Sequence, residues 1–472
     1  MKGNLCGQAP EHRPAARAPS DKIVMGHVRP TAIRIKLRVL SVGVSLTANC
    51  STGEDTTMKR WQSVLFATSV GFGLSAVAAN ASVIAPYFQR NLVSDISGLA
   101  PVTDPNLQNP WGVSESTTSP LWVSDQHANV STLYTIHGLN ATPVSLVVPI
   151  PTQPTPPNGP TGQVNNSTSS FLTNQSGTSA AAHFIFADLN GGIYAWAAAG
   201  NPAAVAVPPT AGNVYTGLAI GGASNSTPFL YAANVAKGRI DVFDATFTNV
   251  TTTTFAGKFV DPSLPAGLVP FDVQTIGGFG ANSEVYVTYA PGGPPANQSG
   301  ATIGQGAVAI FKPDGTFVEQ LIAGTANGSR LAAPWGITLA PPDFGPFSGD
   351  LLVGNFAYGN LNGIPNPGGG EIDAYNPSTG AFLGTLDSNV AWQGLWALTF
   401  GNGVSGGSQN ILYFTTGLNS EADGLLAAVA VPEPGTLALL GMGVLSLCVV
   451  RRRGSSGAAA NASNRDRPGR DC

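Results

Sequence analysis

The stretch that decides the fold runs from Pro334 to Asp387, PWGITLAPPDFGPFSGDLLVGNFAYGNLNGIPNPGGGEIDAYNPSTGAFLGTLD. Four short apolar runs in it, at 334–339, 350–355, 370–375 and 381–386, are separated by Gly, Pro, Asn and Asp. Short runs with such turn residues between them predict a four-stranded antiparallel meander. A single sheet of this kind cannot bury both of its faces, so it needs neighbouring sheets.

Similar units recur on both sides of this stretch. Their first strands are expected to begin at Pro110, Pro160, Tyr215, Pro270, Pro334 and Gly394. Repeats of about 50 to 60 residues with four strands each indicate the blades of a β-propeller. The second strands also recur, and four of the six end in Asp or Asn: Asp125, Asp188, Asn234 and Asn355.

The sixth unit has room for only three strands, because its run at 424–429 is followed directly by a different kind of segment. The segment Tyr87–Val93, in contrast, precedes the first unit and has no sheet of its own. We therefore predict an all-β, six-bladed propeller of four-stranded antiparallel blades over residues 82–430. Tyr87–Val93 is expected to supply the outer strand of the last blade, which removes the exposed edges.

Composition narrows the class of protein. Between Ser82 and Val431 there are 6 Lys and Arg against 19 Asp and Glu, a net charge of −13. Such an acidic body argues against nucleic acid and anionic lipid as partners. The four cysteines, at positions 6, 50, 448 and 472, lie near the ends, so neither a disulfide framework nor a Cys-based metal site is expected in the propeller.

The N-terminal part carries an export signal. Met58-Lys59-Arg60 precedes an apolar run at 64–79, and Ala79-Asn80-Ala81 gives small residues at the −3 and −1 positions. This pattern predicts a signal peptide over 58–81 that signal peptidase cleaves after Ala81. Residues 1–57 are interpreted as a disordered or mis-annotated extension before the true start at Met58. The alternative is a cytoplasmic leader followed by a signal anchor.

The C-terminal part combines Pro432-Glu433-Pro434, an apolar run at 436–450 and Arg451-Arg452-Arg453. Fifteen helical residues span about 22 Å, less than the roughly 30 Å of the hydrocarbon core. The arginines should stay in the cytoplasm. We therefore expect a short segment that anchors the chain transiently in the inner membrane through 436–450, followed by a disordered tail at 454–472.

These three ordered features resemble the PEP-CTERM sorting signal of Gram-negative bacteria. The resemblance implies an exosortase-type enzyme that recognises and cleaves at 432–434, and delivery to the cell surface or exterior. It also implies an association with exopolysaccharide and biofilm. The tail at 454–472 departs from the pattern, since such proteins usually end soon after the arginines. A plain single-span anchor is the alternative to sorting.

The repeat itself (Pro-Trp-Gly-Val, a strand, Asp, then a strand ending in Phe or Tyr) resembles the NHL-type repeat of six-bladed propellers. The whole stretch 87–429, with Asn91–Asp95 and Asp104–Gly112, is similar to a bacterial family of propeller proteins. That family implies no particular activity.

Catalytic motifs are scarce in the sequence. It holds neither G-x-S-x-G nor H-E-x-x-H, and the histidines of the propeller, His127, His137 and His183, are not at metal-ligand spacing. Trp111, Trp335 and Trp396 are expected near the starts of innermost strands, where they could stack on sugar rings or pack between blades.

Oxygen ligands form the other candidate set. Asp272 replaces the glycine expected after the aromatic residue of its unit, and Asp125, Asp188, Asn234 and Asn355 end second strands. Oxygen ligands of this kind suit Ca²⁺, and some six-bladed propeller lactonases hold Ca²⁺ at the axis. Turn capping explains the four strand-end residues equally well.

Two functions follow from these features. The first is an exported, non-catalytic binding or matrix protein for exopolysaccharide or surface partners, with no cofactor. The second is a Ca²⁺-dependent hydrolase or lactonase with axial oxygen ligands. The fold by itself does not decide between them, since propellers host both classes.

Overall fold

A computed structural model describes residues 87–432, apart from 156, 176, 198–201, 281, 362–363 and 387–392. The expected extension 1–57, the signal peptide with Ala79 and Ala81, and the tail 454–472 lie outside the described residues, as do Glu433, Pro434, the apolar run 436–450 and the arginines 451–453. Across the part that the structure describes, no helix has the length and apolar character to cross a membrane.

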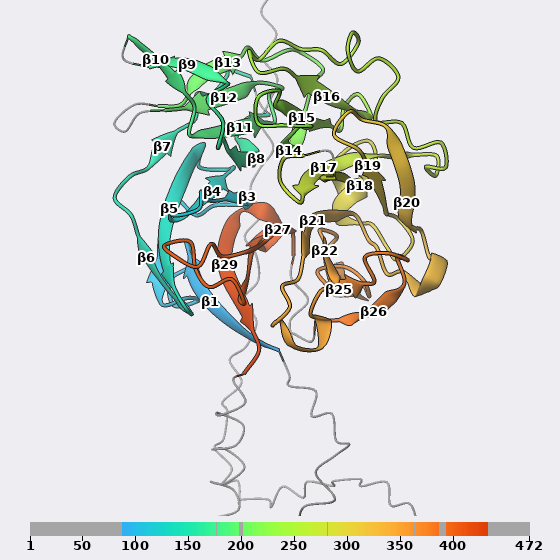
Figure 1. The fold of residues 1–472 in the computed structure, drawn as a ribbon. Coiled ribbons are helices and arrows are strands. Elements are labelled where there is room, and N and C mark those ends of the chain that lie inside the picture. The colour runs from blue at the N-terminus through green and yellow to red at the C-terminus, as the bar shows by residue number, and fades with distance from the viewer. Residues whose placement is uncertain are drawn as a thin grey trace, which may run out of the picture. The chain divides into compact units, whose positions relative to one another are not determined.

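The protein is an all-β, six-bladed propeller with almost no helix (Figure 1). The first blade contains β3 (Pro110–Ser114), β4 (Leu121–Asp125), β5 (Val130–His137) and β6 (Asn140–Pro143), and β7 (Val148–Pro149) pairs with β5. The second blade contains β8 (Pro160–Asn165), β11 (Phe184–Asp188), β12 (Ile193–Trp196) and β13 (Ala204–Val207). Each starts at the axis and proceeds outward, as the repeat predicts.

The third blade contains β14 (Tyr215–Gly221), β15 (Phe229–Asn234) and β16 (Arg239–Phe243). Its outer edge is continued by an isolated bridge between Phe243 and Asn249. The fourth blade contains β17 (Leu268–Ile276), β18 (Glu284–Pro291), β19 (Ala307–Phe311) and β20 (Phe317–Ala323). The fifth contains β21 (Pro334–Leu339), β22 (Leu351–Asn355), β25 (Ile372–Tyr375) and β26 (Phe382–Thr385).

The sixth blade closes the ring as predicted. Its inner strands are β27 (Leu395–Phe400), β28 (Leu412–Gly417) and β29 (Asp423–Ala430), and β1 (Phe88–Ser94) pairs antiparallel with β29 (Figure 1, blue beside orange-red). The Ser94 hydroxyl donates a 2.6 Å hydrogen bond to the Gly424 carbonyl. β2 (Val102–Thr103) adds a short parallel strand outside β1. β1 and β29, the first and last strands of the propeller, thus pair with each other, so neither is left as an unpaired sheet edge.

The remaining elements are short and lie in the connections. They are the hairpins β9 (Leu172–Gln175) with β10 (Thr178–Ala181) and β23 (Asn360–Leu361) with β24 (Ile364–Pro365), the turns α1 (Ala296–Ser299) and α2 (Leu418–Glu421), and the 3-10 turns η1 (Ala326–Gly328) and η2 (Gly345–Phe347).

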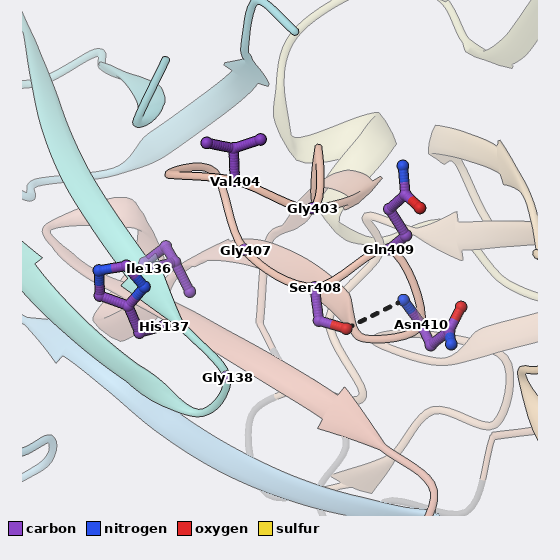
Figure 2. A pocket seen from close by; sticks show the side chains of 9 residues that line it. All are labelled: Ile136, His137, Gly138, Gly403, Val404, Gly407, Ser408, Gln409 and Asn410. Carbon is purple, nitrogen blue, oxygen red and sulfur yellow. Dashed lines mark hydrogen bonds between the residues drawn. The ribbon is translucent and has the colours of Figure 1, made fainter. Parts of the chain in front are cut away.

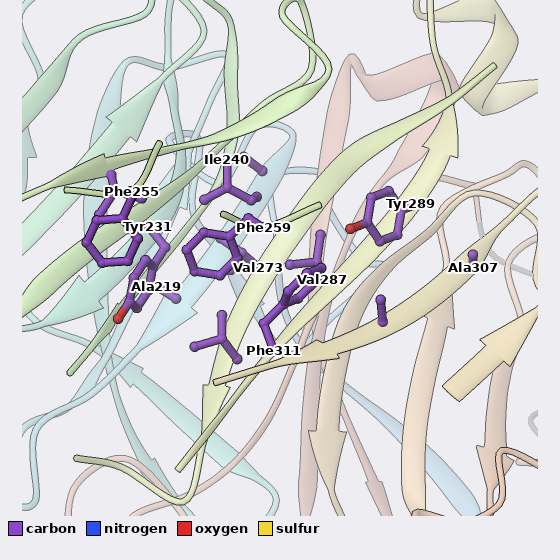
Figure 3. Close-up of a cluster of buried hydrophobic side chains, with 14 of the residues drawn as sticks. Ala219, Tyr231, Ile240, Phe255, Phe259, Val273, Val287, Tyr289, Ala307 and Phe311 are labelled. Carbon is purple, nitrogen blue, oxygen red and sulfur yellow. The ribbon is translucent and has the colours of Figure 1, made fainter. Parts of the chain in front are cut away.

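The hydrophobic core lies between the blades, because each sheet packs its two faces against the two neighbouring sheets. Figure 3 shows the cluster between the third and fourth blades, where Tyr231 and Phe255 meet Phe259, Val287 and Phe311. Alternate residues of each strand point to opposite faces, so each central strand serves two such clusters.

The axis is narrow because the inner strands approach one another closely. A Cβ at Gly112 would lie 2.5 Å from the Thr161 carbonyl oxygen, and one at Gly336 would overlap the Trp396 carbonyl. Glycine therefore occupies this position in four blades, as Gly112, Gly162, Gly217 and Gly336. The fourth and sixth blades carry Asp272 and Ala397 instead.

Candidate functional site

A cavity of about 400 Å³ opens at one end of the axis. Second strands run antiparallel to the inner strands, so the loops that follow them meet the starts of the inner strands at this end. Every blade contributes at least one residue of such a loop, among them Gln126, Leu189, Val235, Gln298, Phe356 and Glu421. The cavity is thus a product of the repeat and not of one loop.

Aromatic rings form the inner wall of this cavity. Trp111 and Trp396 are stacked with ring centroids 3.5 Å apart, and Phe356 lies 4.2 Å from Trp396. Phe271 completes the lining at 6.0 Å from Trp396. Trp335 does not line the cavity; it meets both other indoles edge-on and donates from Nε1 to the Thr216 carbonyl at 3.0 Å.

The three tryptophans singled out by sequence are therefore brought together at the axis. All three are at most 5 % exposed, so nearly all of each side chain is buried. Trp111 and Trp396 also present surface to the cavity. The sequence left open whether these residues pack between blades or meet a ligand, and for Trp111 and Trp396 the geometry is compatible with both.

Glu421 is the carboxyl group that lines the cavity among the described residues. It ends α2, whose residues Asn419, Ser420 and Glu421 have φ values of 51°, 59° and 68°. Three consecutive non-glycine residues in the left-handed region form a strained turn, since each such residue costs about 1–3 kcal/mol. The turn is held by a 2.6 Å hydrogen bond from the Asn419 side chain to Asp423 and by a bridge between Leu418 and Asp423.

The Glu421 carboxylate has two neutral hydrogen-bond donors. The Tyr358 hydroxyl donates to Oε1 at 3.0 Å, and the Asn109 amide donates to Oε2 at 3.3 Å. Burial raises the pKa of Glu421, while the two hydrogen bonds and the nearby His127 partly offset this rise. The His127 ring lies 3.2 Å from the Glu421 backbone carbonyl. Burial and the Glu421 charge also raise the pKa of Tyr358.

Asn109 connects the carboxylate to the aromatic wall. Its side-chain oxygen accepts a 3.0 Å hydrogen bond from Trp396 Nε1, and its amide also donates to Gln126 Oε1 at 2.8 Å. Asn109 itself has a φ of 46°, which Asn tolerates better than most residues. One side chain thus fixes both the indole and the carboxylate.

Sequence reasoning did not identify Glu421, Asn109 or Tyr358. The signal that locates two of them is positional, because Tyr358 and Glu421 lie in loops after second strands, where each unit places a residue at the channel mouth. Their meeting across 63 residues, and that of Asn109 with Glu421 across 312, is not visible in any local pattern.

The residues predicted at the ends of second strands serve the loops of their own blades. Asp125 accepts from the Thr132 amide and hydroxyl, and Asp188 accepts from the Gly159 and Asn190 amides. Asn234 donates to Asp241 at 2.7 Å. Asn355 accepts from the Ala332 amide and donates to Asp373. In the described stretches of the chain, no three His, Cys, Asp or Glu side chains gather as a metal site would need.

Asp272 is different from the other four. It is fully buried on β17 against Gly217, and within the described residues neither of its carboxylate oxygens has a hydrogen-bond partner. Burial raises its pKa well above the usual range. The nearby Val273 amide and Gln274 side chain offset only part of this rise, so burial favours the neutral form of the carboxyl group.

A second, smaller cavity of about 270 Å³ lies at the opposite ends of the inner strands. Ser114, Glu115, Gln163 and Thr275 line it, and each has a buried oxygen without a partner among the described residues. Burial raises the pKa of Glu115 to about 8. Unpaired buried oxygens of this kind are usually satisfied by water or an ion.

A third pocket lies at the periphery between β5 and the loop 403–410 (Figure 2). Ile136, His137, Val404 and Asn410 lie around it together with several glycines, and the backbone N–H of Asn410 donates to the Ser408 hydroxyl at 3.3 Å. The residues that line this pocket are mostly small and uncharged, so they offer few groups that could orient a ligand.

Comparison with known proteins identifies the C-terminal signal. The PEP-CTERM protein-sorting motif matches residues 430–453, as the sequence predicts. The motif implies processing by an exosortase-type sorting system and export to the cell surface or exterior.

Two viral proteins are similar to more than half of the chain. The chain is 27% identical over 344 residues to the uncharacterized protein R648 of Acanthamoeba polyphaga mimivirus, covering 72% of this chain and 78% of the relative. It is 27% identical over 285 residues to protein L690 of the same virus, covering 59% and 71%. The resemblance of 87–429 to a bacterial propeller family stays a prediction.

Among solved structures, a streptogramin B lyase aligns with 74% of this chain and 99% of its own, at 12% identity and a TM-score of 0.40. The α-L-arabinanase of Penicillium chrysogenum, complexed with arabinobiose, aligns with 72% of this chain and 97% of its own, at 11% identity and a TM-score of 0.42.

Proposed function

We propose that this protein is an exported, non-catalytic binding protein that holds a residue of an extracellular polysaccharide in the axial aromatic cavity. The observation that carries the proposal is the meeting of Trp111, Phe271, Phe356 and Trp396 with one carboxyl group, Glu421, at the channel mouth. Ligand sites are typically concave and mostly apolar, with a few fixed polar groups that orient the ligand, and their volumes run from about 300 to 1,000 Å³.

A sugar ring matches this mixed lining. Its C–H faces pack against aromatic rings, while its hydroxyls need hydrogen-bonding groups such as the carboxyl of Glu421 and the carboxamide of Gln298. The strained turn at 419–421 supports a role in binding, because the fold sustains this strain in order to hold Glu421 over the cavity.

Binding is favoured over hydrolysis by the number of carboxyl groups. Glycoside hydrolysis generally uses two carboxyl groups flanking the scissile bond. Glu421 alone supplies a carboxyl to this cavity among the described residues. Its neutral donors, Tyr358 and Asn109, orient it but do not replace a second acid or base.

The experiment is a screen of the purified full chain against a panel of bacterial exopolysaccharides and their oligosaccharides, followed by calorimetry on any binder. Phe356→Leu should weaken binding about tenfold, because it removes ring surface from the cavity wall. The outer-edge variant Phe382→Leu serves as the control, since Phe382 lies on β26 away from the axis. The proposal fails if no glycan binds, or if both variants bind like the wild type.

The Ca²⁺-dependent hydrolase or lactonase remains the second candidate. It draws support from side-chain oxygens that lack a hydrogen-bond partner among the described residues. These belong to Gln163, Thr275 and Asp272 on the inner strands and to Glu115 just after β3. A ligand that binds only the folded protein raises the melting temperature. Calcium titration at millimolar concentration should therefore stabilise the protein if this candidate holds, and an unchanged melting temperature excludes it.

A further inference from the structure

Among the described residues, the Glu421 carboxyl at the channel mouth has no Lys or Arg partner, and the nearby His127 ring lies against its backbone carbonyl. Neither donor to Glu421 is a cation, because Tyr358 contributes a hydroxyl and Asn109 an amide. Lys and Arg are absent from the described lining of the cavity. A carboxylate has about four acceptor positions, so one donor on each oxygen leaves further positions free.

The aromatic wall has the complementary property. Ring faces attract cations through their quadrupole, and this attraction strengthens when the site is shielded from water. Trp111 and Trp396 stack on each other, so they contribute the ring surface that this stacking leaves toward the cavity, and Phe271 and Phe356 add two more rings. A carboxylate and four aromatic rings around one cavity therefore favour a positively charged group over a neutral one.

The propeller as a whole reinforces this preference. Its net charge of −13 between residues 82 and 431 creates a field that attracts cations and repels anions. An acidic polysaccharide such as a uronic-acid polymer is therefore disfavoured.

Deepening the function proposed above, on which this inference rests, we propose that the ligand is an amino sugar with a free ammonium group, within a partly de-N-acetylated polysaccharide. The ammonium group faces Glu421, and the sugar ring packs against the aromatic wall formed by Trp111, Phe271, Phe356 and Trp396. Binding involves no covalent step.

The test compares two probes that differ only in N-acetylation: tetramers of N-acetylglucosamine, which carry neutral acetamido groups, and tetramers of glucosamine, which carry ammonium groups. We expect the wild type to bind the glucosamine tetramer at least tenfold more tightly by calorimetry at pH 6. Glu421→Gln should abolish this preference, because glutamine keeps the shape of the side chain and removes its charge. The matched control is Glu319→Gln, because Glu319 is an exposed carboxylate on β20, and it should retain the preference.

Measuring the preference at high salt distinguishes a contact with Glu421 in the cavity from a general attraction by the net charge of the protein. Exposed charges are largely screened at 0.5 M salt, whereas a partly buried pair is screened much less. The preference for the glucosamine tetramer should therefore survive at 0.5 M salt in the wild type. A preference that disappears at 0.5 M salt, or one that Glu421→Gln retains, overturns the inference.

The outcomes also separate this inference from the proposed function. Binding of neutral glycans with equal affinity for both tetramers overturns the amino-sugar inference alone. If no glycan binds, both the amino-sugar inference and the proposed polysaccharide binding are overturned. A lysine-containing peptide that competes better than the glucosamine tetramer shows that the cavity takes ammonium groups of proteins, and it likewise overturns the amino-sugar assignment.

Discussion

The indole Nε1 of Trp396 donates a 3.0 Å hydrogen bond to the side-chain oxygen of Asn109, 287 residues earlier in the chain. The side-chain amide of the same Asn109 donates to Glu421. Trp396 and Glu421 belong to the sixth blade, whereas Asn109 directly precedes the first strand of the first blade. The aromatic wall and the carboxylate are therefore fixed relative to each other only when the ring is closed.

Asn109→Gly should uncouple this network without straining the backbone, because glycine accepts the φ of 46°. It leaves the buried Trp396 N–H without a partner, at a cost of about 1–3 kcal/mol in the free energy of unfolding. Urea unfolding measures the cost. Asn327→Gly is the control, since Asn327 has a similar φ of 53° but an exposed side chain. Equal stability of the two variants would contradict the role of Asn109.

Closure by β1 should depend on two buried hydrogen bonds. The Tyr87 hydroxyl donates to the Phe344 carbonyl at 2.6 Å, and the Ser94 hydroxyl donates to the Gly424 carbonyl at 2.6 Å. We expect Tyr87→Phe and Ser94→Ala each to cost about 1 kcal/mol or somewhat more, because each leaves a buried carbonyl unpaired. The costs should add, since the sites share no partners. Arg90→Ala, an exposed change on the same strand, should stay within about 0.5 kcal/mol in the same unfolding measurement.

Most of the fold could be predicted from the sequence because the blades repeat their turn chemistry. The starts at Pro110, Pro160 and Pro334 are the first residues of β3, β8 and β21, and the closing strand pairs as expected. Each blade needs the same sheet and the same turns, so the period remains visible although the residues vary. The third blade departs from the pattern, since its described outer edge is a bridge at Asn249 and not a fourth strand.

The candidate site was less accessible to such reasoning. The left-handed turn at 419–421 contains no glycine, so the sequence gives no local signal of positive φ there. Its conformation is stabilised by contacts made only in the folded ring. The sequence drew attention to the three tryptophans, but it could not show that Trp335 meets the other two edge-on and away from the cavity. Asp272 stood out by replacing glycine, and the structure places it fully buried.

Asp272→Asn should stabilise the protein increasingly as the pH rises. Burial raises the folded-state pKa above the unfolded value, so the stability is fully present below about pH 4 and is lost as the pH rises toward the folded pKa. The loss is about 1.4 kcal/mol for each pH unit in that window. Asparagine does not ionise, so the difference between variant and wild type in urea unfolding should grow from pH 4 to pH 7.

Asp241→Asn is the control for this effect. Asp241 is equally buried, but it accepts hydrogen bonds from Tyr215, Asn234 and Arg239. Its carboxylate is therefore compensated, and its substitution should destabilise the protein at pH 7. A wild type that is more stable than Asp272→Asn at pH 7 would show that Asp272 has a partner, such as a bound cation.

Gly336→Ala should be strongly destabilising although it adds only one methyl group. The new Cβ would overlap the Trp396 carbonyl and lie 3.0 Å from the Leu398 amide nitrogen, both backbone atoms of the next inner strand. Backbone of a closed ring cannot move aside as a side chain can, so we expect a loss of about 3 kcal/mol or more in the free energy of unfolding. The reciprocal change, Ala397→Gly at the same position of the sixth blade, should cost only about 1 kcal/mol. If Gly336→Ala were as mild as Ala397→Gly, the inner strands would be free to spread, and close approach at the axis would not be what sets the width of the channel.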